Sequence, residues 1–569
     1  MDDTRISGPS NAPTPVAEGA KPARRRSTTF QLAAVALTIF SALAGTGLAR
    51  LLRAPEGDPK PVVKFPNRLF EKWKKPDLVL VVTGQQKGYL LPCGCSKPQV
   101  GGLERRYNLI EMIRDAGWPY VAIDLGDIAQ RVAPAGLPNE QGLIKYRYSM
   151  RALKEMGYSA VTFGANEVNL GLFNVLTEHS LNDPNPRVVA GNLVGAEKHF
   201  PEMTAPWKLA QPAGTPLKVG VTSIVGPTVI AQMKELARAD PALTFEKKTI
   251  DAINRLLQDM TKQKVDIPVM LYQGLVGSGM KPPPTEAMGL AKAYPQFPVV
   301  VALSEEDEAP SRPVVVRSKT GAETLIVSLG RKGKFIGVIG VYKTGNAAQP
   351  FEYEYERVEL TEDFLTPVAK EKGHPIMELM EAYTRELKAD GGEKSYLAKH
   401  GRVRHALQVM PEVKNLKKPV VGDVTYAGSE ACKKCHPDAY AVWEKTGHAH
   451  AYKTLVQAKR PENRQYDPEC IVCHTVGFGI VSGFATEMAT PLLKDVGCES
   501  CHGPASAHVA NSHNAEWKKR INPWRHLPAN KREDAIDQMC QKCHDIDNDV
   551  HWSFKKKWPQ IIHPTPKDE

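Results

Sequence analysis

Short runs of β-branched and other apolar residues recur between residues 78 and 341, and stretches with helical spacing separate several of them. Such runs are typical of buried strands, whereas apolar residues at every third or fourth position are typical of helices packed on a sheet. The predicted strands are 78–82, 120–125, 160–163, 188–190, 217–224, 267–272, 299–303, 324–329 and 335–341, and the predicted helices are 105–116, 146–156 and 249–262. This alternation predicts one large α/β domain over residues 77–360.

The pattern changes after residue 360. Residues 375–388 have helical spacing with Pro375 in the first turn, and residues 361–423 are therefore predicted to form a solvated helix and a basic linker. In residues 424–569 Leu, Ile and Val are sparse, while 11 of the 16 histidines of the chain lie there. We expect a mainly α-helical domain whose core is not built from aliphatic side chains.

The N-terminal residues have a third pattern. Residues 1–27 are rich in Pro, Ser and charge, which predicts a disordered cytoplasmic segment, and residues 28–49 form an apolar stretch behind Arg24, Arg25 and Arg26. The stretch is either a signal anchor in the inner membrane or a signal peptide cleaved near Ala42-Leu43-Ala44, and a core helix of a soluble protein is a third interpretation. Residues 50–76 are predicted to form a tether. Either of the first two interpretations places the rest of the chain outside the cytoplasm, in the periplasm.

The chain has a net charge of +11 but no nucleic-acid-binding motif. We therefore interpret the charge as serving solvation and membrane topology, and we expect no nucleic-acid partner. All 10 cysteines fall in short motifs. This usage is typical of cofactor or redox chemistry and differs from a disulfide framework.

Four copies of the pattern C-x-x-C-H stand near the C-terminus. The cysteine pairs are Cys432 and Cys435, Cys470 and Cys473, Cys498 and Cys501, and Cys540 and Cys543, followed by His436, His474, His502 and His544. Two thiols one helical turn apart reach one edge of a porphyrin, and the adjacent histidine ligates the iron. Chance does not produce four copies, and tetrahedral zinc does not require a histidine after every pair. The sequence therefore predicts four covalently bound c-type haems.

The seven other histidines in residues 424–569 are candidates for the sixth iron ligand. The segments around residues 443–450, 498–508 and 558–563 resemble the tetrahaem family of cytochrome c554. That resemblance implies His448, His508 and His563 as distal ligands. His450, His513, His526 and His551 are more typical of surface histidines, so at least one haem is expected to keep an open position for a small substrate.

The α/β domain resembles the 5′-nucleotidase type of calcineurin-like metallophosphatase. The similarity rests on Gly101-Gly102-Leu103, Leu125-Gly126-Asp127, Gly164-Ala165-Asn166-Glu167 with Gly171, Ala190-Gly191-Asn192 and the segment 329–337. It implies a four-layer α/β sandwich and, in the family, two catalytic metal ions that activate water.

The metal ligands of that family are largely absent from this sequence. Gln85 and Lys87 stand where the family has Asp and His, Gly164–Glu167 lacks the family's histidine, and Gln273 replaces another. Ser304-Glu305-Glu306-Asp307 replaces the final Gly-His-x-His segment, and only Asp127 clearly remains. A dinuclear metal site is not expected from this set, so phosphate hydrolysis is disfavoured.

Cys93-Gly94-Cys95 follows the altered first motif directly. A disulfide across one residue is strained and easily reduced, and nearby basic residues favour the thiolate, so the pair is interpreted as a redox centre. A structural disulfide and metal capture remain alternatives.

Together these features resemble the extracytoplasmic multihaem (seleno)protein families of bacteria, in some of which a selenocysteine replaces one of the two cysteines. The favoured function is electron transfer between a redox partner protein or quinone-linked donor, the haems and the Cys93–Cys95 pair. A small-molecule substrate would act at that pair or at an open haem. The alternatives are a phosphohydrolase with an accessory cytochrome and a reductase acting at the open haem.

Overall fold

Side chains along a strand face alternate sides of a sheet, and this rule organises the α/β region. In β1 (Leu78–Thr83), Leu78, Leu80 and Val82 belong to one buried cluster, while Val79 and Val81 belong to another. Both faces of β1 are therefore covered, as its uninterrupted apolar run predicts.

The structure is a computed structural model that describes residues 63–92, 97–132, 139–180, 185–200, 202–237, 243–277, 286–319, 321–388, 402–409 and 424–564. The predictions for 1–27 and 28–49, most of the predicted tether, and Cys93 and Cys95 lie outside these residues.

The described residues form two mixed sheets. The seven-stranded sheet has the order β13 (Gln349–Glu359), β12 (Phe335–Asn346), β1, β2 (Tyr120–Asp124), β3 (Tyr158–Val161), β4 (Arg187–Val189), β5 (Thr204–Ala205). The six-stranded sheet has the order β10 (Val314–Arg317), β11 (Glu323–Val327), β9 (Val299–Leu303), β8 (Ile267–Leu275), β7 (Val219–Val225), β6 (Trp207–Ala210). Strands β1 to β5 are parallel, as are β7, β8, β9 and β11.

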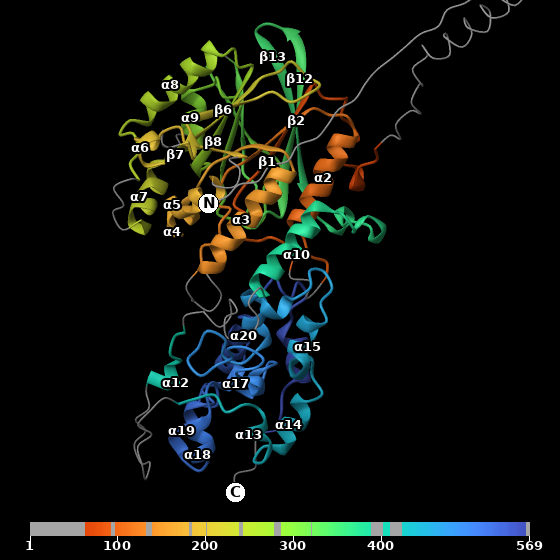
Figure 1. Cartoon of the computed structure of the whole chain (residues 1–569), viewed down its shortest axis with the longest axis vertical. Coiled ribbons are helices and arrows are strands. Elements are labelled where there is room, and N and C mark those ends of the chain that lie inside the picture. Colours follow the sequence, from red (N-terminus) through yellow and green to blue (C-terminus); the bar gives the residue numbers. More distant parts are fainter. Residues whose placement is uncertain are drawn as a thin grey trace, which may run out of the picture. The chain divides into compact units, whose positions relative to one another are not determined.

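Three apolar clusters separate four layers. The inner faces of the two sheets meet in one cluster, which includes Leu80, Val221 and Val301. The outer face of the seven-stranded sheet packs on helices α2 (Leu103–Asp115), α3 (Glu140–Glu155), α5 (Leu172–Ser180) and α10 (Pro375–Lys388). The other sheet packs on α8 (Thr249–Lys262) and α9 (Ala287–Ala293), and Figure 1 shows these helices and α2 and α3 on opposite sides of the strands. The predicted four-layer α/β sandwich is confirmed.

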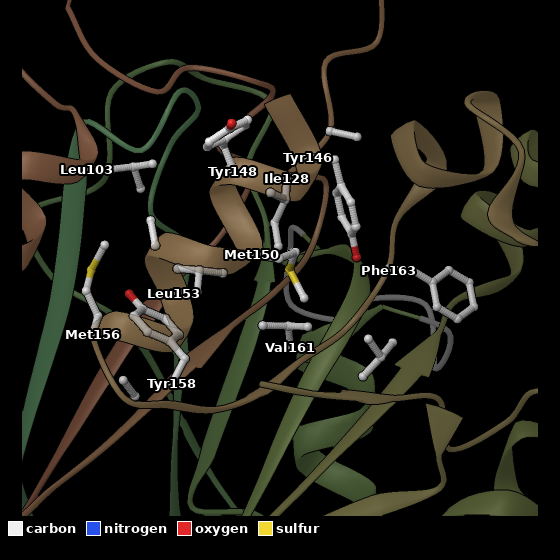
Figure 2. Close-up of a cluster of buried hydrophobic side chains, with 14 of the residues drawn as sticks. Leu103, Ile128, Tyr146, Tyr148, Met150, Leu153, Met156, Tyr158, Val161 and Phe163 are labelled. Carbon is white, nitrogen blue, oxygen red and sulfur yellow. The ribbon is translucent and has the colours of Figure 1, made fainter. Parts of the chain in front are cut away.

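Helix α3 contributes much of the outer cluster. Figure 2 shows Met150 and Leu153 of α3 beside Val161 and Tyr158 of β3. Tyr146, on the same helix, is also buried. Complete burial of one such side chain stabilises the fold by about 1.5–3 kcal/mol.

Three parts of the region differ from the sequence prediction. Residues 63–76, assigned to the tether, pack against the sandwich, because Phe70 is buried and contacts the Trp118 ring. Helix α10 was expected to be solvated, but Ile376 and Leu387 are buried against the outer cluster. Strand β13 was not predicted, although its alternate residues Phe351, Tyr353 and Tyr355 pack on the inner cluster.

Residues 424–564 form short helices with few apolar contacts. They are α13 (Glu430–Lys433), α14 (Pro437–Trp443), α15 (Ala451–Val456), α16 (Pro468–His474), α17 (Cys498–His502), α18 (Ser506–Ala510), α19 (Ala515–Arg520), α20 (Ala529–Cys540) and α21 (Phe554–Lys557). The buried clusters here are small, and one consists of Val424, Ala507 and Trp517. The predicted helical C-terminal region is confirmed. In the parts of the chain that the structure describes, no helix has the length and apolarity needed to cross a membrane.

The remaining helices are α4 (Ala165–Asn169), α6 (Ala196–His199), α7 (Pro227–Leu236) and α12 (Ala406–Val409). Helix α4 begins at Ala165, has Gly164 as its N-cap and carries Asn166 and Glu167.

Candidate functional site

Each C-x-x-C-H segment forms one helical turn. In two copies the whole segment is helical, in α16 and α17. In the others the backbone N–H of His436 donates to the carbonyl oxygen of Cys432 at 2.9 Å, and that of His544 donates to Cys540 at 3.0 Å. Residues three and four apart on a helix share a face. The two sulfurs and the imidazole of each segment are therefore held on one side of its turn.

Hydrogen bonds orient three of the four proximal imidazoles. The Nδ1 atom lies 2.7 Å from the Ala451 carbonyl oxygen in His474 and 2.7 Å from the Ile521 carbonyl oxygen in His502. In His544 it lies 3.0 Å from an Asp549 carboxylate oxygen. An Nδ1–H that donates to oxygen leaves Nε2 with its lone pair free, which is the arrangement of metal-ligating histidines.

Three histidine pairs join distant parts of this region. The ring centroids lie 6.2 Å apart for His436 and His508, 6.0 Å for His448 and His544, and 6.1 Å for His502 and His563. Each pair combines a histidine of a C-x-x-C-H segment with one of the three that the sequence analysis selected as distal ligands.

The spacing of these pairs fits a haem iron. Two imidazoles on opposite sides of one iron, with metal–nitrogen distances of about 2 Å, have ring centroids about 6 Å apart. Burial lowers the pKa of His436, His448, His474, His502 and His508, which favours the neutral imidazole that metal ligation needs.

His474 is the exception among the proximal histidines. Within the described ranges no ring contact joins it to a second imidazole, in contrast to the other three. The side chains of His450, His513, His526 and His551 are exposed. Among the described residues, no second histidine is therefore placed to share an iron atom with His474.

The cysteines show which segments are neighbours. The thiol of Cys432 is in hydrogen-bonding reach of Cys498, and that of Cys473 is in reach of Cys543. The first and third segments are thus adjacent, as are the second and fourth. Short separations of this kind suit transfer of electrons between attached groups.

The loop after His544 contacts the sandwich at Gln99, Lys332 and Lys334. The Gln99 side-chain amide donates to the Asp547 carbonyl oxygen at 2.8 Å, and Lys334 Nζ lies 2.6 Å from Asp547 Oδ1. Lys332 bridges Asp547 and Asp307. The ion pairs lower the pKa of Asp547 against the effect of its burial. Sequence reasoning gave no indication of this contact.

A second contact links the same two regions. The Gln141 side-chain amide donates to Asp467 Oδ1 at 2.8 Å, and the buried Lys145 pairs with Glu469. Asp467 and Glu469 flank Pro468 at the start of α16, which carries Cys470, Cys473 and His474.

Protein hydrogen bonds occupy the side chains at the positions where the sequence analysis compared this chain with the metal motifs of metallophosphatases. Gln85 exchanges two bonds with the Ser304 backbone, at 3.0 Å and 2.7 Å, and Gln273 donates to the Leu125 carbonyl oxygen. Asn192 bonds to both backbone groups of Val225. These side-chain amides therefore hold backbone segments in place by hydrogen bonds.

Asp127 and Glu167 are the buried acids at these positions. Asp127 Oδ1 accepts the Asn166 backbone N–H at 2.9 Å, and Glu167 accepts those of Gly164 at 2.7 Å and Ala129 at 2.8 Å. Burial is the main cause of the raised pKa of both carboxyl groups, and that of Glu167 rises to about 7. In the part of the chain that the structure describes, no group of three or more His, Cys, Asp or Glu side chains is placed to hold a metal ion. These residues do not fit a dinuclear metal centre.

Residues 431–503 match the family profile "Cytochrome c554 and c-prime". Cytochrome c-554 of Nitrosomonas europaea is 29% identical over 140 residues, which cover 22% of this chain and 60% of the relative. The chain thus spans less than two thirds of that relative.

Several solved structures resemble the sandwich. They include a 5′-nucleotidase precursor of Thermus thermophilus (20% identity, TM-score 0.43, 55% of this chain and 59% of the other) and the calcineurin-like phosphoesterase YfkN of Bacillus subtilis (14% identity, TM-score 0.41, 54% and 96%). A third is the sulfate thiohydrolase SoxB of Thermus thermophilus (13% identity, TM-score 0.41, 55% and 60%).

The match of the C-terminal region supports a c-type cytochrome with covalently attached haem in that part of the chain. More particularly, this region is similar to cytochrome c554, and it follows an α/β sandwich that resembles the 5′-nucleotidase fold.

Proposed function

We propose that this protein is an exported tetrahaem electron-transfer protein whose haems exchange electrons with the Cys93–Cys95 pair. The observation that carries the proposal is the set of three imidazole pairs with ring centroids 6.0–6.2 Å apart. Each pair includes the histidine of a separate C-x-x-C-H turn, and a fourth such turn carries His474.

The residues of the chain have four tasks in this proposal. The eight cysteines of the C-x-x-C-H segments would hold the haems covalently, and His436, His474, His502 and His544 would bind iron. His508, His448 and His563 would supply the second imidazole for the haems at His436, His544 and His502. Bound haem supplies one-electron redox chemistry, and two histidine ligands favour low-spin iron of low potential. Ala451, Ile521 and Asp549 keep the proximal rings in the ligating orientation.

The thiol pair is the proposed two-electron site. Oxidation of the Cys93 and Cys95 thiols to one disulfide would release two protons to solvent and two electrons, which bound haem, as a one-electron carrier, would take up one at a time. The contact of Gln99 with Asp547 supports this coupling, because Gln99 follows Cys95 by four positions in the chain and is held against the loop that follows His544. A redox partner protein or a quinone-linked donor would exchange electrons with the haems.

Export follows from the same chemistry. Haem attachment to thiols outside the cytosol agrees with residues 28–49 acting as an inner-membrane anchor or a signal peptide. We place the haems and the sandwich in the periplasm. Hydrolysis of phosphate esters is not part of the proposal, because the acids and amides of the former metal centre are engaged with the backbone.

A second function is favoured by one observation. Among the described residues no imidazole faces His474, so a haem there would keep a position for a small substrate and the protein would act as a reductase. Its test is titration of the oxidised protein with cyanide. Binding at one haem per chain supports the function, and no binding refutes it.

The main test is a reductive titration of the haem-loaded protein and of the double variant Cys93→Ser, Cys95→Ser. We expect the double variant to take up two electrons fewer per chain and to retain all haem absorbance. Ser96→Ala, at the next residue, is the matched control and should titrate like the unmodified protein. Equal electron uptake by the double variant and the unmodified protein would refute the redox role of the pair.

A further inference from the structure

His544 differs from the other oriented proximal histidines in the charge of its hydrogen-bond partner. His474 and His502 direct Nδ1 at backbone carbonyl oxygens, which are neutral. His544 directs Nδ1 at a carboxylate oxygen of Asp549, 3.0 Å away. Only 15% of the Asp549 side chain is exposed, so water screens its charge incompletely. One of the three oriented rings therefore has a partly buried negative charge beside it.

The turn after His544 fixes the position of Asp549. The Asp549 N–H donates to the Asp545 carbonyl oxygen at 2.7 Å, and the Asp549 carbonyl oxygen accepts the Trp552 N–H at 3.0 Å. Asp545 Oδ1 accepts the backbone N–H groups of Asp547 at 3.0 Å and Asn548 at 2.8 Å. The carboxylate is thus held against the imidazole by a hydrogen-bonded turn.

Trp552 packs on the same imidazole. Its ring is stacked on that of His544, with the centroids 4.6 Å apart and an angle of 22° between the planes. Trp552 Nε1 donates to Asp537 Oδ1 at 2.8 Å, which ties the indole to helix α20. An indole on one side of the imidazole keeps water from it, and charges act more strongly where water is excluded.

The chemistry of this hydrogen bond follows from its two partners. An ionised carboxylate only accepts hydrogen bonds, so Nδ1 of His544 carries the hydrogen and Nε2 has the lone pair for a metal. A carboxylate that accepts from a metal-ligating imidazole makes the ligand more basic. Ferric iron has one more positive charge than ferrous iron, so a more basic ligand and a nearby negative charge both favour the ferric state.

We infer that Asp549 is a positioning residue that lowers the reduction potential of the haem held at Cys540, Cys543 and His544. The neutral carbonyl partners of the other two oriented rings have no such effect. The haem at His544 is then a stronger reductant than it would be with a carbonyl partner. This inference rests on the proposed haem attachment, but it does not depend on the Cys93–Cys95 pair.

The test is a potentiometric titration of the full-length, haem-loaded protein and of Asp549→Asn, followed by electron paramagnetic resonance. At one fixed potential, the ferrous-to-ferric ratio of a single haem should be about tenfold higher in Asp549→Asn, a shift of about 59 mV for a one-electron couple. Asp549→Glu keeps the charge and should stay within about threefold. The Asn oxygen can accept the same N–H, so a role limited to orienting the ring would leave the ratio unchanged.

Asp534→Asn is the matched control, because it removes the same charge from an exposed position on helix α20. It should change no haem by more than about twofold. The inference is overturned if Asp549→Asn titrates like the unmodified protein or like Asp534→Asn while four haems are present. Absence of haem from the Cys540–His544 segment of the unmodified protein would refute the proposed function as well.

A second measurement decides the test if Asp549→Asn does not retain its haems. The low-spin signal that disappears in His448→Ala identifies the haem at His544, and the signal that disappears in His563→Ala identifies the haem at His502. In the unmodified protein, the first signal should titrate at a lower potential than the second. The reverse order, or equal midpoints, would overturn the inference.

Discussion

The sandwich and the C-terminal region differ in the groups that form their cores. The sandwich buries aliphatic side chains in three clusters between its four layers. The C-terminal region has small apolar clusters but many histidines, and its best-defined long-range contacts are imidazole pairs spaced for an iron atom. The first region folds by excluding water from its own side chains, whereas the second needs its cofactors as part of the core.

Removal of the haems is expected to have the largest effect and tests this difference between the two regions most strongly. Protein made without cytochrome c maturation should lose the structure of residues 424–564, because a core group larger than any side chain is missing. The loss of stability should exceed about 3 kcal/mol, the cost of removing one large aromatic side chain. Limited trypsin digestion should degrade that region and leave the sandwich intact. Equal protease resistance of both regions would contradict the comparison.

The reverse experiment acts on the sandwich alone. Leu80→Ala creates a cavity between the two sheets, where Leu80 is fully buried, and should lower the free energy of unfolding by about 2–5 kcal/mol. Thermal unfolding followed by circular dichroism measures this loss, and the Soret spectrum should not change. The exposed Val315→Ala is the control, with an expected loss below about 0.5 kcal/mol. A changed Soret spectrum in Leu80→Ala would mean that the two regions do not fold independently.

A single distal ligand offers a narrower test. His508→Ala should convert one haem per chain, the one at His436, from low-spin to high-spin iron, because the sixth ligand is lost. Electron paramagnetic resonance measures the conversion. His513→Ala, an exposed histidine in the next segment, should leave the spectrum unchanged. Identical spectra for the two variants would remove His508 from the ligand set.

The smallest effect is expected at the contact between the regions. Lys334→Gln removes an ion pair with Asp547 in which both side chains are largely buried, and should lower the free energy of unfolding by about 1–3 kcal/mol. Lys262→Gln breaks the exposed pair with Asp259 and should cost less than about 0.5 kcal/mol. Denaturant titration compares the two. A loss no larger in Lys334→Gln than in Lys262→Gln would show that the contact does not stabilise the protein.

The two regions also differ in how far sequence predicts them. Strands β1 to β4, β7 to β9, β11 and β12 were found, because burial on both faces leaves a continuous apolar pattern. Strands β5, β6 and β10 were not predicted. Strand β13 was missed because its alternating Glu and aromatic residues resemble a polar connection, although Phe351, Tyr353 and Tyr355 carry a period of two. Residues 63–76 were misassigned to the tether because prolines and charges hid the buried Phe70.

At the candidate sites, the sequence could not predict contacts between residues that are far apart in the chain. The C-x-x-C-H turns are local, so sequence alone located them. The pairing of His448 with His544 joins residues far apart in the chain and needed the fold.

Haem stoichiometry measured together with iron spin state tests the central claim most directly. The account predicts four covalently bound haems per chain in the fully oxidised protein, three with low-spin signals from paired imidazoles and one, at His474, with a high-spin signal. A protein that carries no covalent haem after maturation, or whose haems are all high-spin, would contradict it.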